Sequence, residues 1–423
     1  MSELTITRVW GREVLDSRGN PTVEAQVETD AVIVTAIAPS GASTGTFEAL
    51  ELRDGDSRYG CKGVQKAVRN VRDLISPRLK GMDVSDLRSI DAAMIELDGT
   101  ENMGRLGGNA TTAVSYAAAK AGAILKGVEL HEHLGSKSKV LPVPSMNVIN
   151  GGKHAGSNLK IQEFMIVPCG MPSFSEALRA GVEVYHNLKT VLKKEMGPMS
   201  INVGDEGGFA PSFDTSRQAM DVLIKAIEAA GYQPGKEVYL AMDAAASEFY
   251  SKGVYTLDGK KMGTGEIVDF YSKVAQEYPL ISLEDPVHEE GFEDMVELTR
   301  KLGKKLQIMG DDMFVTNPVR LRKGIEMGAG NAMLLKVNQI GTITKAMQAA
   351  EICFDRGYNV QVSHRSGESE DTTMADIAVA LECGQIKSGA PARTERTAKY
   401  NRLLRIEENL GSKAKFMGRG AFF

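Results

Sequence analysis

Six short apolar runs in the C-terminal two-thirds of the chain each end on a charged or titratable side chain. Five of them are VYLAMD, LISLE, LQIMGD, AMLLK and VQVSH, and a sixth, weaker run is GQIK. They end at Asp243, Glu284, Asp311, Lys336, His364 and Lys387, in steps of 41, 27, 25, 28 and 23 residues. A strand, a loop and a helix together take about 25 to 30 residues, so this spacing predicts repeated βα units.

Repeated βα units can close into a barrel whose strand C-termini all face one mouth, where the active site lies. We therefore expect three carboxylates, two lysines and one histidine to converge on one cleft. The start of this region is less regular. The segments NVINGGKHAG and KIQEFMIVP predict two neighbouring strands, followed by helices between residues 173 and 196. Their spacing leaves the direction of these two strands open.

The first 135 residues or so have a different pattern, which predicts an α+β domain. Residues 4–38 indicate strands around a turn at 17–21, and residues 63–126 repeat their apolar positions with a helical period. A polar segment with two prolines, SKSKVLPVP, then places the boundary to the βα region near residues 136–142.

Composition narrows the class of protein. The 423 residues are 42% apolar and 25% charged, as in an ordinary soluble globular protein. The net charge of −5 argues against a general nucleic-acid or acidic-membrane surface. The four cysteines form no CxxC motif, which favours reduced thiols in the cytoplasm. The N-terminus lacks the apolar region of a signal peptide, and no stretch approaches the ~20 apolar residues of a membrane span.

The three acidic strand ends are candidates for a metal site. Hard divalent cations such as Mg²⁺ prefer carboxylate oxygens, completed by water and substrate oxygens. Asp243, Glu284 and Asp311 on successive strands would suit such an ion. The alternative is that each acid only caps the helix that follows its strand.

Lys336 and Glu206 are candidates for proton transfer. Lys336 ends an apolar run, and burial there, with a metal or a second lysine nearby, would push its pKa below the ordinary value of about 10.4 and allow it to act as a base. A lysine that reaches solvent or pairs with a carboxylate is the alternative. Glu206 lies between glycines in GDEGG, where the backbone can approach a ligand closely, although a plain acidic loop has the same composition.

Cationic and hydroxyl side chains at the last two strand ends suggest an anionic ligand. Arg365 and Ser366 follow His364, and a guanidinium with a hydroxyl is a good clamp for phosphate. Lys387 adds a second cation. The loop PSGASTG could hold phosphate or close over the site, but it also reads as a surface loop. His154, flanked by glycines, is equally ambiguous.

These groups together suit one chemistry. A proton α to a carboxylate is very weakly acidic, and its removal creates an enolate with two negative charges on the carboxyl group. Divalent cations stabilise that species, a lysine removes the proton, and an acid assists the leaving group. Lysine bases paired with magnesium ions are a known pattern of enolase-superfamily sites.

Motifs along nearly the whole chain closely resemble the enolase family. They include EVLDSRGNPTVE, PSGASTG, NVINGGKHAG, IQEFMIVP, GDEGGFAP, MDAAASEFY, GDDMFVTNP, LLKVNQIGT, VSHRSGESEDT and GQIKSGAPARTERTAKYN. The resemblance implies an α/β fold: a TIM-like eight-fold α/β barrel over residues 140–423, with an irregular ββαα start and one antiparallel strand. A smaller α+β capping domain over residues 1–135 precedes it.

The resemblance also implies a reaction and its residues. The reaction is the reversible dehydration of 2-phosphoglycerate to phosphoenolpyruvate, in glycolysis and gluconeogenesis, by a hydro-lyase with two Mg²⁺ per site, which Mn²⁺ could replace. Lys336 would be the base and Glu206 the acid, with Glu163 beside it. The expected metal residues are Asp243, Glu284 and Asp311 for the first ion and Ser43 for the second. The expected substrate contacts are Arg365 and Ser366 to phosphate, Lys387 to carboxylate, and Gln162, His154 and His364 along the pocket. Lys387 would also lower the pKa of Lys336.

Three points stay open at this level. Family members are dimeric or octameric, and segments such as VIVTAIAPSGAS, RYGCKGV and EDPVHEEGFEDM depart from the common pattern outside the site, which weakens a prediction of subunit contacts. Another magnesium-dependent acid dehydratase is a rival, but its usual KxK motif or His–Asp pair is not evident. A barrel without catalysis, kept for binding, is the second rival, although the chain retains the base, the acid and the three metal carboxylates.

Overall fold

The N-terminal part of the chain is a three-stranded sheet with helices packed on it. The computed structural model describes residues 3–41, 47–135, 138–154 and 158–423. The antiparallel sheet runs in the order β1 (Ile6–Leu15), β2 (Pro21–Thr29) and β3 (Ile33–Ile37). The turn between the first two strands is held by Asp16, whose carboxylate accepts hydrogen bonds from the backbone N–H groups of Arg18 and Asn20 at 2.8 and 2.9 Å.

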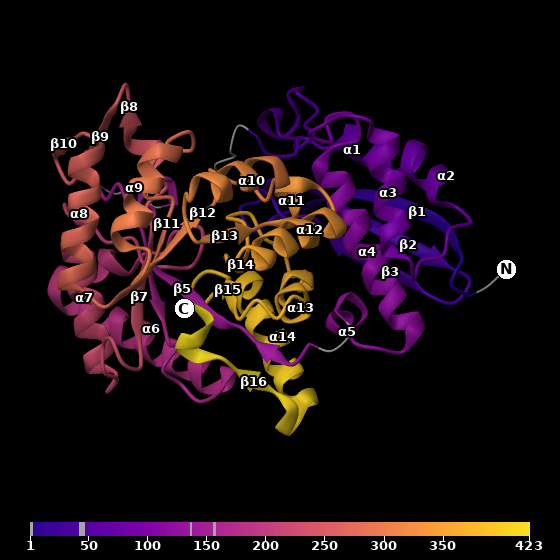
Figure 1. The fold of residues 1–423 in the computed structure, drawn as a ribbon. Helices are drawn as coiled ribbons and strands as arrows, with labels where there is room; N and C mark the ends of the chain where they lie inside the picture. The colour runs from indigo at the N-terminus through magenta and orange to yellow at the C-terminus, as the bar shows by residue number, and fades with distance from the viewer. Residues whose placement is uncertain (1–2, 42–46, 136–137, 155–157) are drawn as a thin grey trace.

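The helices of this part follow the sheet in sequence, as the pattern predicts. They are α1 (Gln65–Asn70), a π-helical turn (Val71–Ile75), α2 (Ser76–Leu79), α3 (Leu87–Asp98), α4 (Gly108–Lys126) and α5 (Leu130–Leu134). The alanine-rich α4 packs against β2 and β3 and is buried along most of its length. Its small side chains let it lie close both to the sheet and to the second part of the chain (Figure 1).

Eight strands in the second part form a closed barrel. In chain order they are β5 (Val143–Asn150), β6 (Glu163–Val167), β7 (Tyr239–Asp243), β11 (Leu280–Glu284), β12 (Gln307–Gly310), β13 (Ala332–Leu335), β14 (Asn359–Ser363) and β15 (Gln385–Lys387). β6 pairs antiparallel with both β5 and β7, and the other pairs are parallel. Two helices, α6 (Phe174–Met196) and α7 (Ser216–Ala229), separate β6 from β7. The expected ββαα start with one antiparallel strand is confirmed.

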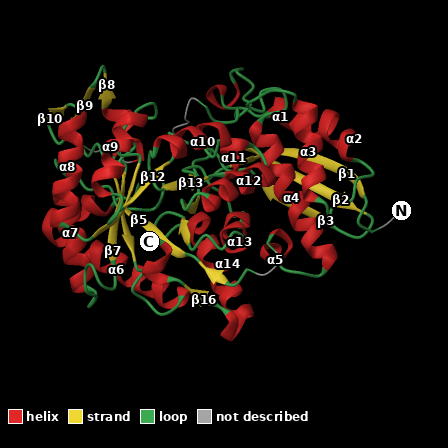
Figure 2. Ribbon diagram, in the orientation of Figure 1, coloured by secondary structure: helices red, strands yellow, loops and turns green. Residues whose placement is uncertain are grey.

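Helices surround the barrel (Figure 2). They are α8 (Thr264–Glu277), α9 (Phe292–Leu302), α10 (Pro318–Met327), α11 (Val337–Ile340), α12 (Ile343–Asp355), α13 (Thr373–Ala380) and α14 (Thr394–Leu410). Short strands β8 (Tyr250–Ser251), β9 (Val254–Leu257) and β10 (Lys260–Met262) form a separate small sheet, and β4 (Val140–Leu141) pairs with β16 (Lys415–Phe416). No helix among the described residues is both long and apolar enough to cross a membrane.

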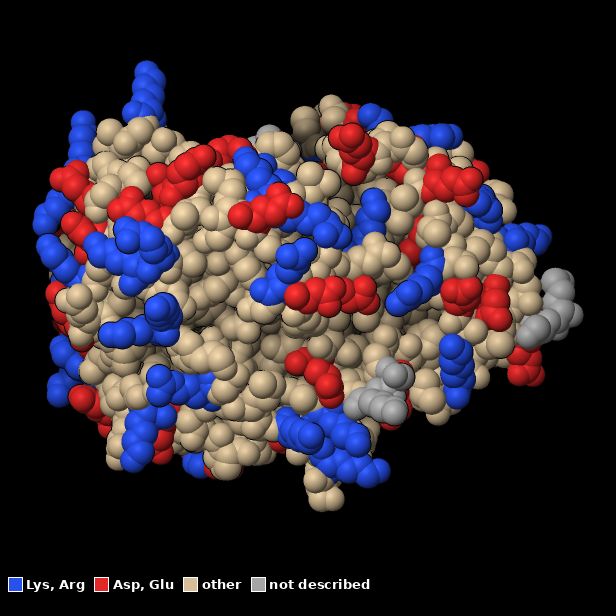
Figure 3. Space-filling view, viewed as in Figure 1, with Lys and Arg blue, Asp and Glu red and all other residues tan. Residues whose placement is uncertain are grey.

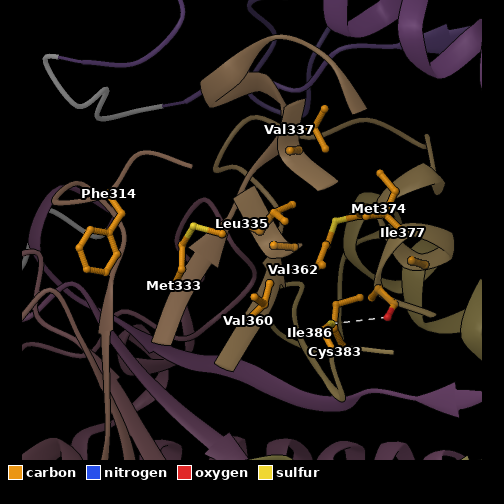
Figure 4. Packing of buried hydrophobic residues seen from close by; sticks show 14 of the residues in the cluster. Phe314, Met333, Leu335, Val337, Val360, Val362, Met374, Ile377, Cys383 and Ile386 are labelled. Carbon is orange, nitrogen blue, oxygen red and sulfur yellow. Dashed lines mark hydrogen bonds between the residues drawn. The ribbon is translucent and has the colours of Figure 1, made fainter. Parts of the chain in front are cut away.

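Every barrel strand is buried on both faces, which explains its continuous apolar run. Alternate residues of β13 and β14, such as Leu335 and Val362, point outward and pack against Met374 and Ile377 of α13 (Figure 4). The intervening positions face the barrel interior, which is partly polar. There Gln307 and Gln385 exchange hydrogen bonds of 2.8 and 2.9 Å between their side-chain amides.

Polar contacts from α3 and α4 fix the N-terminal part against the barrel helices. Asp91 of α3 accepts a hydrogen bond from the backbone N–H of Thr344 at 2.9 Å, at the start of α12. Lys120 of α4 pairs with Asp371 at 2.6 Å, just before α13. Because Asp91 is fully buried and the Asp371 side chain is only 6% exposed, these contacts fix the position of the N-terminal part over the strand ends that it faces.

Candidate active site

The strand ends converge as the spacing of the apolar runs predicts. β7, β11 and β15 end on Asp243, Glu284 and Lys387, and Asp243 lies beside Glu284 in the β7–β11 register. The other three residues directly follow strands β12, β13 and β14; they are Asp311, Lys336 and His364. The ladder ends at these positions, so their side chains reach the barrel mouth while the residues before them stay in the core.

A pocket at this mouth contains most of the predicted site residues. Those in its wall are Gln162, Glu163, Glu206, Asp243, Asp311, Lys336, His364, Arg365, Ser366 and Lys387. Glu284 is fully buried and reaches this group through Lys387. His154 ends the short 3-10 helix Gly152–His154, and its side chain lies outside the described part of the chain. Ser43 also lies outside the described residues.

Lys387 sits at the centre of a ring of carboxylates. Its ammonium nitrogen is 2.8 Å from Glu284 Oε2 and 3.1 Å from both Asp243 Oδ2 and Glu163 Oε2. Burial opposes the charge of Lys387, but these carboxylates outweigh burial and raise its pKa well above the ordinary value. Burial and then the neighbouring acids raise the pKa of Glu163 and Glu284. The ring therefore holds more acidic groups than cations.

Lys336 pairs with Asp311, which corrects one expectation. Burial lowers the pKa of Lys336, and Arg365 and Lys387 lower it further, as predicted. The carboxylates of Asp311 and Glu284 outweigh these effects, so the net pKa lies above the ordinary value. The lysine is thus desolvated as the sequence predicts, but its charge is held by the acid at the next strand end.

Two further acids enlarge the cluster beyond the sequence prediction. Asp285 accepts hydrogen bonds from the backbone N–H groups of Asp311 and Asp312, both at 2.8 Å. Burial and the neighbouring acid Asp311 raise the pKa of Asp312 to about 8. Asp285 directly follows Glu284 in LEDP, and Asp312 directly follows Asp311 in GDD. The sequence therefore shows a second acid after each of these two strand ends, but our prediction considered only the first acid of each pair.

The carboxylate cluster fits a divalent cation. Its donors are all oxygens, which is the chemistry that hard cations prefer. Glu284 Oε1 is buried and has no hydrogen-bond partner among the described residues. A buried carboxylate oxygen without a donor is costly, and coordination by a cation would remove that cost.

Arg365 is held by a residue from the N-terminal part. Its guanidinium contacts both carboxylate oxygens of Glu48, at 2.7 and 3.2 Å, and donates to Asn338 Oδ1 at 3.1 Å. Glu48 and Arg365 are both nearly fully buried. The sequence patterns did not single out Glu48 or Asn338, because their roles depend on contacts that join distant segments.

Glu206 lies in a tight loop opposite His364. Its Oε2 accepts a hydrogen bond from Asn147 Nδ2 at 2.9 Å and lies 3.4 Å from His364 Nε2. Burial, supported by Arg396, lowers the pKa of His364 to about 4, so the ring is neutral at pH 7. A Cβ at Gly208 would lie 2.0 Å from Asn150 Oδ1, which explains why this loop needs glycine.

The comparisons with known proteins agree over both parts of the chain. Residues 6–134 match the family model described as "Enolase, N-terminal domain", and residues 138–422 match "Enolase, C-terminal TIM barrel domain". The chain is 59% identical over 422 residues to a protein named Enolase from Methanopyrus kandleri, covering 99% of both chains. It is 57% identical to Enolase from Thermococcus kodakarensis and 58% identical to Enolase from Methanocaldococcus jannaschii, each over 98% of this chain and 97% of the relative.

Proposed function

Because the chain belongs to the enolase family, and so is a hydro-lyase that dehydrates 2-phosphoglycerate reversibly to phosphoenolpyruvate in glycolysis, we propose a division of this chemistry among its residues. Lys336 removes the proton from C2 of 2-phosphoglycerate. Its position directly after β13, in the pocket wall with a side chain only 13% exposed, supports this role. It acts in its neutral form, after its contact with Asp311 is released.

Glu206 is proposed as the acid that helps the hydroxyl group leave from C3. It gives a proton to that oxygen as the C3–O bond breaks, so that water departs. The loop after α6 carries Glu206 into the pocket, where Asn147 and His364 approach its carboxyl oxygen. Glu163, on β6, lies in the same pocket and assists Glu206.

Asp243, Glu284 and Asp311 are proposed to hold the first Mg²⁺, or Mn²⁺ in its place. Ser43 is proposed for a second ion. Divalent cations bound there would supply the positive charge that frees the two lysines from the carboxylates and stabilises the dianionic enolate. The all-oxygen donor set supports this proposal, as does Glu284 Oε1, for which the described part of the chain supplies no hydrogen-bond donor.

The remaining pocket residues are proposed to bind the substrate. Arg365 and Ser366 bind the phosphate, because a guanidinium and a hydroxyl are suited to its oxygens. Lys387 faces the substrate carboxylate. Gln162 and His364, which lie in the pocket wall, are proposed to line the cavity around the reacting carbons, and His154 is proposed to join them.

Some broader features are also proposals. We expect a dimer or octamer, and no nucleic-acid partner, which is supported by the mixed acidic and basic side chains over the face in Figure 3. We expect the enzyme to work in the cytoplasm, where its four free cysteines would stay reduced. The division into residues 1–135 and 140–423 also remains a prediction.

The single observation that carries the proposed roles is that one pocket at the barrel mouth brings together Lys336, Glu206, Asp243 and Asp311, with Glu284 buried behind them against Lys387. The test is ultraviolet absorbance of phosphoenolpyruvate formed from 2-phosphoglycerate and Mg²⁺. Chelator and a Lys336→Ala variant should abolish the signal, and Lys413→Ala at an exposed site should not.

Two other outcomes would change the account in different ways. A flat trace from folded, metal-loaded protein would contradict the enzymatic function. Full activity in Lys336→Ala would keep the function and overturn the assignment of the base.

A further inference from the structure

Arg396 is the largest side chain that is fully buried in the described structure. It lies in the first turn of α14, in the segment that follows Lys387, and no sequence pattern singled it out. A guanidinium keeps its charge at all ordinary pH values, so complete burial is costly unless the surroundings bond it well. Its contacts therefore indicate what the buried charge is for.

The guanidinium joins the two loops that carry the proposed acid and the proposed phosphate ligands. Its Nη2 donates to the carbonyl of Asp205 at 3.1 Å, next to Glu206. The two Nη atoms donate to the carbonyls of Arg365 and Ser366 at 2.6 and 2.5 Å. These backbone oxygens are neutral, so the Arg396 guanidinium is held mainly by hydrogen bonds to carbonyl groups and not by salt bridges. The contact with Glu395 Oε1, at 3.8 Å from Nε, is long.

The remaining contact of Arg396 bears on the state of His364. Arg396 Nη1 lies 2.6 Å from His364 Nδ1. Arginine can only donate hydrogen bonds, so Nδ1 must accept and cannot carry a proton. A neutral ring then carries its proton on Nε2, and Nε2 is the atom that lies 3.4 Å from Glu206 Oε2.

We propose that Arg396 is a positioning residue for the dehydration, because it fixes His364 as the neutral tautomer with the proton on Nε2. In this state the ring directs its N–H side to Glu206, whose Oε2 lies 3.4 Å away without hydrogen-bond geometry in this structure, and its partial positive charge attracts that carboxyl group. The inference rests on the proposed role of Glu206 as the acid. Without Arg396, His364 is free to place its proton on either nitrogen, and the Nδ1–H tautomer offers Glu206 a lone pair in place of a donor.

The tautomer can be measured directly by NMR. The chain has six histidines, so protein labelled with ¹⁵N only in histidine gives few ring signals, and a His364→Gln variant identifies those of His364. We expect Nδ1 of His364 to be unprotonated and Nε2 protonated in the unsubstituted enzyme. A proton on Nδ1 would overturn the proposal, and this readout needs no variant of Arg396 and no turnover.

Substitution tests whether Arg396 causes the tautomer. In Arg396→Met we expect His364 to show a mixture of tautomers and kcat to fall by about 10-fold or more, since general acid catalysis contributes about 10² to 10⁴. Arg396→Lys keeps a donor for Nδ1 and should restore the Nε2–H tautomer. If Arg396→Met fails to fold, the protonation state of Nδ1 in the unsubstituted enzyme remains the deciding measurement. Arg322→Met, at an exposed arginine, is the matched control.

The outcomes separate the inference from the proposed function. An unchanged tautomer in folded Arg396→Met would overturn the positioning role, even if the enzyme remains a hydratase. If the tautomer changes in Arg396→Met while kcat stays the same, the link from Arg396 to Glu206 is wrong. Loss of activity in the unsubstituted enzyme would instead count against the proposed function, because the tautomer signal does not depend on it.

Discussion

Gln339 shows how one side chain can couple two proposed roles. It is fully buried, donates from Nε2 to Asp311 Oδ1 at 2.8 Å, and accepts from Thr316 Oγ1 at 2.8 Å. Thr316 Oγ1 in turn accepts from the backbone N–H of Lys336 at 3.0 Å. The proposed metal ligand and the proposed base thus share one hydrogen-bond network, so a change at Gln339 should affect both.

We expect Gln339→Met to lower both activity and stability. The variant removes the hydrogen bonds that Gln339 makes with Asp311 Oδ1 and Thr316 Oγ1, which should cost about 1–3 kcal/mol in the free energy of unfolding. Without the hydrogen bond from Gln339, the carboxylate of Asp311 is less firmly oriented toward a metal ion, so the Mg²⁺ concentration needed for half-maximal rate should rise. Metal titrations of the initial rate and urea unfolding measure the two effects. Gln348→Met, at an exposed position of α12, should change neither, and equal metal dependence in both variants would contradict the account.

At the residue scale, the sequence identified a functional side chain only where the residue stands at a recognisable position of a predicted strand. Asp243 and Lys336 stand out because they end apolar runs. Glu48 and Arg396 act through contacts with Arg365 and His364, which are hundreds or tens of residues away in the chain. The pKa of Lys336 was also predicted in the wrong direction, because that value depends on the distance to Asp311.

At the scale of elements, α3 and α12 meet through a buried acid. Asp91 accepts the hydrogen bond of Thr344 N–H at the first turn of α12, and burial raises its pKa from 3.8 to about 6. A carboxyl group with a higher pKa in the folded state binds its proton more tightly there. Ionised Asp91 therefore lowers the stability of the fold, and this effect is complete above about pH 6. The effect disappears as the pH falls from about 6 toward 4, where the carboxyl group is protonated in the folded state.

We expect Asp91→Asn to remove this dependence while keeping an oxygen for Thr344. We compare the free energy of unfolding of the variant with that of the unsubstituted protein. The advantage of the variant should be larger at pH 7 than at pH 4, by an amount on the order of 3 kcal/mol. Urea unfolding at the two pH values measures the difference. An equal gain in stability at pH 7 and pH 4 would contradict the prediction, because it would show that folding does not raise the pKa of Asp91.

The elements themselves were largely predictable, and the exception has a physical cause. The apolar runs predicted the parallel strands because strands buried on both faces carry unbroken apolar sequences. The direction of β6 (Glu163–Val167) did not follow from its pattern, since a buried strand has the same composition whichever way it runs. Only the resemblance to the family implied that it is antiparallel.

At the scale of the whole molecule, the N-terminal part completes the barrel mouth. Glu48 comes from this part and binds Arg365 of the barrel through both carboxylate oxygens. The sequence predicted two regions of different class, but not this contact, because nothing in either pattern records which surfaces meet. The arrangement of subunits stays a prediction for the same reason.

We expect Glu48→Gln to weaken the attachment of the N-terminal part. It removes the negative charge beside a buried guanidinium, and loss of one partner in such a pair costs about 3–5 kcal/mol. Thermal unfolding should shift to lower temperature, and proteolysis between the two regions should become faster. Glu101→Gln, at an exposed site of the N-terminal part, is the control. An unchanged transition in Glu48→Gln would show that Arg365 is satisfied by its other contacts.

The central claim is that Lys336 removes the C2 proton and Glu206 acts afterwards on the leaving group. Its most direct test is incorporation of deuterium at C2 of 2-phosphoglycerate in D₂O with Mg²⁺, followed by NMR. Glu206→Gln should still exchange the C2 proton while it forms almost no phosphoenolpyruvate, and Lys336→Ala should do neither. Exchange that continues in Lys336→Ala would contradict the account, because another group would then be the base.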